Sequence, residues 1–275
     1  MSSYQDSLVG FYDILGFSEY VRGHTTPEDV RRIFRRVRDA SSIDPDLAEM
    51  IGSRSVHFSD TIIRTTPFLS PSGEPNRHGI LIHEILDALH FQIDMISQGL
   101  VFVRGAITCG QAIHTDTEVF GPAVIRAYEL ERDVVIFPRI IVDPVVVAEL
   151  VSSPNLRGFQ HTVNQERYHF TRLMRLSEDG VWFIDYLRAV ENELDDPTLE
   201  YVPFLRHHRD MILRGLAGSS SLTRVTHKYL WLAHYHNGVV SELRDDDSED
   251  AVLEKPALFI TSDNAPLYQP LPNKA

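Results

Sequence analysis

The sequence contains a single cysteine, Cys109, among its 275 residues, so no disulfide can form within the chain. This excludes the small secreted folds that depend on disulfides and favours a reducing compartment. The N-terminus lacks the features of a secretory signal, and no apolar run approaches the roughly 18–20 residues that span a bilayer. The longest apolar region, residues 134–151, is interrupted by prolines and charges. We therefore predict a cytoplasmic location and no membrane partner.

Basic side chains are outnumbered: 26 Lys and Arg stand against 39 Asp and Glu, which gives a formal net charge of −13 at pH 7. Broad binding to nucleic acid requires a basic surface that neutralises phosphates, so we expect no nucleic-acid partner. Hydrophobic residues make up 43% of the chain, enough for a folded core. A nucleotide that arrives with a metal ion remains compatible with this charge.

Several common catalytic motifs are missing as well. The sequence has no glycine-rich Walker loop, no Gly-x-Ser-x-Gly elbow and no dinucleotide-binding fingerprint. Its histidines lack the spacing to carboxylate or thiolate partners that is typical of a zinc site. Any chemistry must therefore come from another set of residues.

Apolar periodicity predicts strands and helices in an α+β order, with helices packed on one sheet. Two late helices are expected at residues 198–217 and 220–237. The expected strands are 8–15, a hairpin over 55–66 that turns at Ser59 and Asp60, 101–108, 134–142, 168–176 and 180–187. The expected helices of the first half begin at Thr26, span 82–96 and follow Gly121 and Pro122.

Two aspartates lie where a carboxylate needs a compensating partner. Asp13 is inside the apolar run of the first strand, and Asp60 is at the predicted hairpin tip. If strand and hairpin are neighbours, the carboxylates repel by about 4 kcal/mol at ~4 Å and an effective dielectric of about 20, which a divalent cation offsets. Taken singly, each aspartate is better explained as a local hydrogen-bond acceptor. Together they favour a Mg²⁺ or Mn²⁺ site.

Four segments resemble the class III nucleotidyl cyclases, the superfamily of adenylate and guanylate cyclases. Residues 11–18 (FYDILGFS) are similar to the first metal motif, and residues 58–61 (FSDT) are similar to the second. Residues 103–110 (VRGAITCG) and 119–124 (VFGPAV) resemble the strand and the helix start that follow. The resemblance implies a ferredoxin-type sheet with helices packed on it and a C-terminal helical extension.

Gly121 and Pro122 with residues 127–131 (AYELE), and residues 228–237, look closer to the Pycsar-type pyrimidine cyclases of bacterial anti-phage defence. This resemblance implies conversion of UTP, or alternatively CTP, to its 3′,5′-cyclic monophosphate and pyrophosphate. It also implies a homodimer with active sites at the subunit interface, and a separate effector that the cyclic nucleotide activates.

The resemblance assigns two Mg²⁺ or Mn²⁺ ions to Asp13, Asp60 and the backbone carbonyl of Ile14. One ion would lower the pKa of the ribose 3′-hydroxyl for attack on the α-phosphorus, and the other would hold the triphosphate. Backbone amides at the end of the first strand are expected to take phosphate oxygens. These triphosphate-binding residues are Gly16, Phe17 and Ser18.

The sequence departs from the purine cyclases at the residues that stabilise the transition state. Ile125 and Glu129 stand where those enzymes carry an asparagine and an arginine. Another cation must therefore meet the charge on phosphorus. Arg104 is the leading catalytic candidate and Arg126 the second, with an ordinary surface or sheet-edge cation as the alternative for Arg104.

The base-binding positions depart too. Val56, with His57 beside it, stands where purine cyclases carry a lysine or a glutamate, and a valine cannot hydrogen-bond a purine edge. The second position is Glu118, an acceptor-only carboxylate that suits uracil N3–H or the cytosine amino group. An exposed loop acid is the alternative for Glu118. The pattern agrees with a pyrimidine and does not choose between UTP and CTP.

We predict a catalytic domain over residues 1–190, a C-terminal helical extension over 191–240, and an acidic loop with a loose tail over 241–275. The second hypothesis is a catalytically inactive nucleotide-binding sensor. A plain interaction module is disfavoured because it has no use for paired acids at Asp13 and Asp60.

Overall fold

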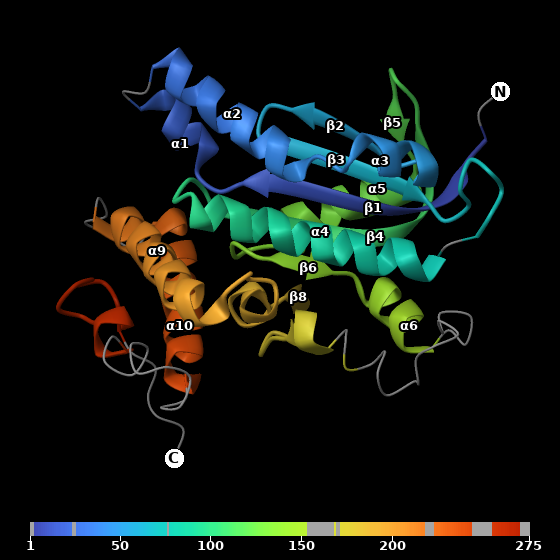
Figure 1. Cartoon of the computed structure of the whole chain (residues 1–275). Coiled ribbons are helices and arrows are strands. Elements are labelled where there is room, and N and C mark those ends of the chain that lie inside the picture. Colours follow the sequence, from blue (N-terminus) through green and yellow to red (C-terminus); the bar gives the residue numbers. More distant parts are fainter. Residues whose placement is uncertain are drawn as a thin grey trace. The chain divides into compact units, whose positions relative to one another are not determined.

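The computed structural model describes residues 3–23, 26–75, 77–152, 168, 171–217, 223–243 and 255–269. The chain divides into two compact units: unit 1 comprises residues 1–92 and 102–186, and unit 2 comprises 93–101 and 187–275. Figure 1 shows the elements of both. The segments that carry the predicted site all belong to unit 1.

Unit 1 is built on one mixed eight-stranded sheet in the order β2-β3-β1-β4-β6-β8-β7, with β5 paired to β4. The central strand β1 is antiparallel to both β3 and β4, and β4 is parallel to β6. The strands are β1 (Gln5–Ile14), β2 (Arg54–Phe58), β3 (Thr61–Pro67), β4 (Val103–His114), β5 (Val119–Phe120), β6 (Ile140–Val142), β7 (Met174–Leu176) and β8 (Trp182–Ile184). The predicted α+β fold is confirmed.

Helices pack on both faces of this sheet. Neighbouring residues of β1 project to opposite sides, so β1 presents aromatic side chains to the helices on each face. The Phe11 ring contacts Tyr128 of α5 at 5.9 Å between centroids, and the Tyr12 ring contacts Phe91 of α4 at 6.3 Å. The helical elements are α1 (Phe17–Arg22), α2 (Pro27–Ser41), α3 (Pro45–Ile51), α4 (Arg77–Ser97), α5 (Pro122–Glu129), η1 (Leu130–Val134), α6 (Pro144–Ser152), α8 (Tyr186–Ala189), η3 (Val190–Asn192), α9 (Pro197–Ala217) and α10 (Arg224–Glu242). Among the described helices, none has the length and apolarity needed to cross a bilayer.

A buried charge network fixes β3 against α4 beneath the central strand. The Arg64 guanidinium, 2% exposed, donates to the Asp87 carboxylate at 3.0 Å and to the Ser41 carbonyl at 2.6 Å. Its second acidic partner, Glu84, is also buried and accepts from the Tyr12 hydroxyl. A charge buried this deeply is costly when it loses its partner, so the network opposes any slip of β1 or β3.

The strands after α5 are shorter than predicted. Residues 130–134 form the π-helix η1, so the strand predicted over 134–142 is reduced to β6. Residues 171–173 are helical, so the late strand pair is also reduced, to β7 and β8. Short apolar runs fit a strand or a buried helical turn equally well, and the sequence pattern did not separate them.

Unit 2 contains α9 and α10, which agree with the predicted C-terminal helices. The segment 255–269 packs on α10: the Asn237 side chain donates to the Ile260 carbonyl at 2.7 Å and to the Tyr268 hydroxyl at 2.9 Å. Tyr268 is buried, so the prediction of an acidic loop with a loose tail over 241–275 is wrong at this residue. Residues 244–254 and 270–275 of that predicted segment lie outside the described residues.

Two buried histidines join α9 to α10. The Nδ1 atoms of His208 and His236 are 3.1 Å apart, and His236 Nε2 lies 3.0 Å from the Leu258 carbonyl. A carbonyl only accepts, so His236 carries its proton on Nε2 and accepts from His208 Nδ1–H. This arrangement requires His236 to be neutral, and burial also lowers the pKa of His208.

Unit 2 is therefore expected to lose stability in mild acid. Burial lowers the pKa of His236 to about 4, against roughly 6.5 in the unfolded chain. The stabilisation is complete above the unfolded value and is lost as the pH falls toward 4, about 2 kcal/mol at pH 5 from this ring. Urea unfolding at pH 7 and pH 5 checks this. His236→Gln should flatten the dependence and the exposed His227→Gln should not; equal slopes in all three proteins would contradict it.

Candidate active site

The sheet register brings the two predicted metal-binding aspartates together. Asp13, near the end of β1, pairs across the strands with Thr61 of β3 and Arg104 of β4. Asp60 directly precedes Thr61 in the turn between β2 and β3. The two carboxyl groups are close enough for Asp60 to raise the pKa of Asp13. Residues far apart in the sequence thus form one acidic pair at the end of the central strand.

The turn that carries Asp60 is strained at one residue. Two residues, Ser59 and Asp60, connect the paired ends Phe58 and Thr61. Ser59 has φ 56°, in the left-handed region that glycine usually occupies in such tight hairpins. Strain of this kind persists where the surrounding structure enforces it, often at functional sites. Phe58 at the same tip is 80% exposed, so packing of its own ring does not explain the turn.

The environment of Asp13 opposes an isolated negative charge. Burial raises the pKa of the Asp13 carboxyl; the Arg104 guanidinium works against this rise, and the Asp60 carboxyl adds to it. A divalent cation would favour the ionised form of both acids.

Arg104 is part of the site but is engaged by two acids. Its Nε donates to Asp13 Oδ2 at 2.8 Å, its Nη2 contacts the Glu131 carboxylate, and its Nη1 donates to the Val135 carbonyl at 3.2 Å. The second candidate cation, Arg126, donates to Asp143 Oδ2 at 2.9 Å, and Asp143 also accepts from Thr108. Arg104 therefore lies beside the paired aspartates, and Arg126 is held by a different carboxylate.

The donor set at the acidic pair fits Mg²⁺ or Mn²⁺. Asp13 and Asp60 offer carboxylate oxygens, and the residue after Asp13, Ile14, has the predicted carbonyl ligand; all are hard oxygen ligands of the kind that these ions prefer. Within the described ranges, no three His, Cys, Asp or Glu side chains form a metal-binding group. An ion at this pair would thus take further oxygens from backbone, water or a phosphate.

The predicted triphosphate contacts follow β1 directly. Gly16 has φ 75°, a left-handed conformation that turns the chain from β1 into α1. The amides of Phe17 and Ser18 belong to the first turn of α1, where N–H groups have no partner within the helix. The Phe17 side chain is buried against the Phe34 ring at 5.0 Å, so only its backbone is available to a ligand.

Two of the three predicted base-binding residues share a pocket. Val56 and Glu118 line a cavity of about 340 Å³ between the start of β2 and the hairpin that joins β4 to β5. His57 is not among the residues that line this cavity. Burial lowers the pKa of His57, as do the nearby Arg38 and Arg64. The cavity thus brings Val56 and Glu118 together, and a base contact by His57 stays a prediction.

The same pocket contains polar groups that the sequence did not single out. His114 Nδ1 lies 2.8 Å from the Thr65 hydroxyl, and burial lowers the pKa of His114, with Arg54 adding to the effect. Arg54 is paired with Asp116. The pocket thus combines an apolar wall with several hydrogen-bonding groups, the usual make-up of a site that orients a small ligand.

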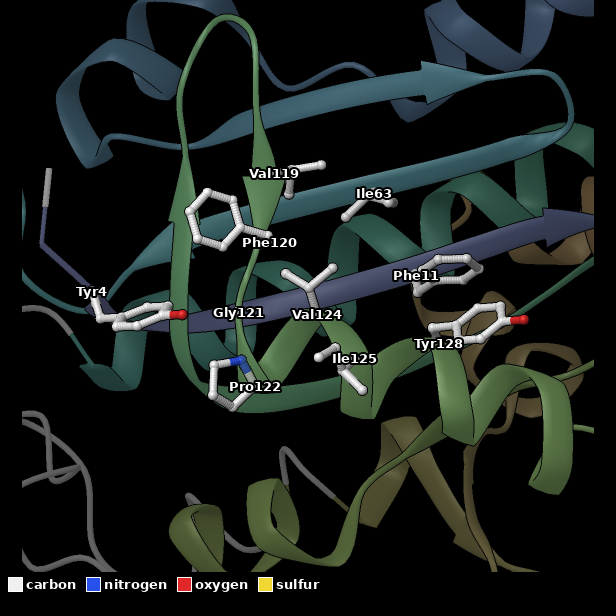
Figure 2. Close-up of a pocket in the computed structure, with 10 residues that line it drawn as sticks. All are labelled: Tyr4, Phe11, Ile63, Val119, Phe120, Gly121, Pro122, Val124, Ile125 and Tyr128. Carbon is white, nitrogen blue, oxygen red and sulfur yellow. The ribbon is translucent and has the colours of Figure 1, made fainter.

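A separate apolar groove opens on the α5 face of the sheet, with a volume of about 500 Å³ (Figure 2). In the view of Figure 2, Phe11 and Tyr128 lie together near one end and Tyr4 lies near Gly121 and Pro122 at the other. The remaining lining residues are Ile63, Val119, Phe120, Val124 and Ile125. Four of the side chains that line the groove are also substantially exposed: Tyr4, Phe120, Ile125 and Tyr128.

Glu131 is the residue of this region that the sequence argument missed. It is 8% exposed and contacts the Arg104 guanidinium. A signal was present, because Ala123, Ala127 and Glu131 are spaced four apart, and such positions lie on one helix face. Ala123 and Ala127 are buried. An acid that continues this buried face needs a cationic partner.

Fold and site together define an α+β protein with paired carboxylates beside an arginine at the end of the central strand. Neither the protein-family models nor the curated proteins give a match to this sequence. Solved structures do.

The chain is similar to the monomeric guanylyl cyclase domain of the RhoGC fusion protein from the aquatic fungus Blastocladiella emersonii, at 14% identity and TM-score 0.42, over 66% of this chain and 95% of that one. It is similar to the catalytic core of a rhodopsin-guanylyl cyclase with converted specificity in complex with ATPalphaS, at 14% identity and TM-score 0.43, over 66% and 96%. A class III adenylyl cyclase-like ATP-binding protein from Pseudomonas aeruginosa gives 11% identity and TM-score 0.39, over 94% and 73%. These values are too low to transfer an activity, so the functional argument depends on the residues.

Proposed function

We propose that this protein is a nucleotidyl cyclase that converts a pyrimidine nucleoside triphosphate, UTP ahead of CTP, to its 3′,5′-cyclic monophosphate and pyrophosphate. The observation that carries the proposal is the convergence of Asp13 and Asp60 next to Arg104. An interaction surface gains nothing from placing two carboxylates side by side, because their repulsion is costly. A pair of divalent cations gives the arrangement a use.

In this proposal, Asp13, Asp60 and the Ile14 carbonyl hold two Mg²⁺ or Mn²⁺ ions. When bound, these ions supply activation of the ribose 3′-hydroxyl and charge neutralisation on the triphosphate. The amides of Gly16, Phe17 and Ser18 orient the phosphates at the strand end. Arg104 is within reach of the same place and supplies a cation for the charge that develops on phosphorus.

The pyrimidine preference is supported by the pocket that Val56 and Glu118 share. Glu118 can only accept hydrogen bonds when ionised, and both uracil N3–H and the cytosine amino group donate. Val56 offers no hydrogen bond to the edge of a purine. A cavity of about 340 Å³ is also at the small end of ligand pockets.

We further propose a homodimer with active sites at the subunit interface. The apolar groove of about 500 Å³ supports this, because an open apolar groove rimmed by exposed side chains is typical of an interaction surface. A second copy of the chain covers such a surface symmetrically. The cyclic product would act as a second messenger for a separate effector in anti-phage defence, the part of the proposal that derives from sequence resemblance.

Incubation of the purified protein with Mn²⁺ and each of ATP, GTP, CTP and UTP tests the proposed reaction. We expect one cyclic mononucleotide, cyclic UMP, detected by mass spectrometry together with pyrophosphate. Cyclic CMP instead would give the cytidylate cyclase. Nucleotide binding without any product would favour an inactive sensor, the alternative that the engagement of Arg104 by two acids supports. A cyclic purine product would contradict the assigned base specificity.

A further inference from the structure

Arg104 is held on two sides, and only one side belongs to the proposed metal site. Its Nε donates to Asp13 Oδ2 at 2.8 Å. On the other side, its Nη2 contacts Glu131 and its Nη1 donates to the Val135 carbonyl at 3.2 Å. Glu131 and Val135 come from η1 and the residue after it, an element separate from the strand that carries Asp13. The guanidinium can therefore lose one partner and remain anchored by the others.

The three charged side chains lie in a largely dehydrated environment. Their exposed fractions are 17% for Asp13, 20% for Arg104 and 8% for Glu131. Charges interact more strongly here than in water. A divalent cation on Asp13 would meet a full positive charge that contacts the same carboxylate, so the two cations oppose each other.

We propose that Arg104 competes with the divalent cation for Asp13, and that Glu131 is the positioning residue that keeps Arg104 in place when it leaves Asp13. The inference rests on the proposed function, in which a metal ion and a triphosphate bind at this strand end. The triphosphate supplies new anionic oxygens for the Nε edge of the guanidinium, while Glu131 and the Val135 carbonyl hold the opposite edge. Metal binding then depends on the nucleotide. Without nucleotide, Arg104 stays on Asp13 and keeps divalent ions from the acidic pair.

Titration with Mn²⁺ alone, without nucleotide, tests the competition. Arg104→Met removes the competing charge and is expected to bind Mn²⁺ at least about ten-fold more tightly than wild type, because a unit charge ~5 Å from a divalent ion matters at this level even in water. Arg104→Lys retains the charge and should stay close to wild type. Calorimetry, or the electron paramagnetic resonance signal of free Mn²⁺, measures the affinity.

Arg77→Met is the matched control. Arg77 also pairs with two carboxylates, Asp6 and Glu149, and it lies at the opposite end of β1. Its loss changes the net charge equally and should leave the Mn²⁺ affinity unchanged. An equal gain in Mn²⁺ affinity in both methionine variants would show that overall charge causes the effect, and it would overturn the competition.

Glu131→Gln is expected to act in the opposite direction. Without its second acid, Arg104 pairs more strongly with Asp13, so Mn²⁺ binding should weaken a few-fold. The double variant Arg104→Met with Glu131→Gln keeps the wild-type net charge and does not leave a charged Glu131 buried without Arg104. It should bind Mn²⁺ more tightly than wild type. If Arg104→Met alone does not fold, this double variant tests the competition in its place. Unchanged or weaker binding in a folded Arg104→Met or double variant would overturn the inference.

These titrations contain no nucleotide, so their outcome is separate from turnover. Tighter Mn²⁺ binding in Arg104→Met, combined with a wild type that cyclises no triphosphate, supports the competition and defeats the proposed function. Cyclisation by wild type with no gain in Mn²⁺ affinity in Arg104→Met supports the function and overturns the competition.

Discussion

Replacing Asp60 with asparagine is expected to lower the rate of cyclisation by a factor on the order of 10²–10³ while leaving thermal unfolding nearly unchanged. The variant keeps the size of the side chain and removes one of the two carboxylates that hold the ions. Stability should survive, because Asp60 is a half-buried turn residue whose charge repels the buried Asp13. Removing that charge relieves repulsion and breaks no core contact.

The control for this experiment is Asp39→Asn, which removes an equal charge from the exposed face of α2. Its turnover should equal that of wild type. Product formation is measured by mass spectrometry, and folding by the circular dichroism melt of the same samples. Wild-type turnover in Asp60→Asn would remove the metal assignment. Asp13→Asn is a poorer test because it also takes a partner from Arg104.

The acidic pair could be predicted from the sequence because each aspartate is in an unusual local position. A carboxylate inside the apolar run of β1 needs compensation, and a polar pair between two β-rich segments predicts a tight turn. Antiparallel neighbours then place a turn residue beside the end of the adjacent strand, as the register of Asp13 with Thr61 confirms. Here local chemistry and sheet topology agree.

The partners of Arg104 could not be predicted from the sequence in the same way. Its contact with Glu131 depends on how far α5 continues, and the chain widens there into a π-helix that periodicity did not predict. The positions of Val56 and His57 illustrate a second limit. Neighbouring side chains of a strand project to opposite faces, and sequence proximity alone made these two appear as a pair. Contacts across elements require side-chain directions, which the order of residues does not supply.

Mixed dimers test whether the proposed site is shared between two chains. For a site at the subunit interface, we propose that one copy supplies Asp13 and Asp60 and that the other supplies the base pocket of Val56 and Glu118. Val56→Trp is expected to fill that pocket, about 340 Å³ in volume, and abolish turnover as Asp60→Asn does. A dimer with one copy of each variant carries both defects in one site and none in the other.

Such dimers, isolated through two different affinity tags, should recover about half of the wild-type activity, since one of two symmetric sites is intact. Each parent variant alone remains inactive, so the activity recovered in the mixed dimers stands out from both parents. Mixing Asp60→Asn with Asp13→Asn is the matched control. Both changes then affect the acidic half, every site retains a defect, and no recovery is expected. Inactive mixed dimers of Asp60→Asn with Val56→Trp would show that each site lies within one chain, and tags that never co-purify would contradict the dimer itself.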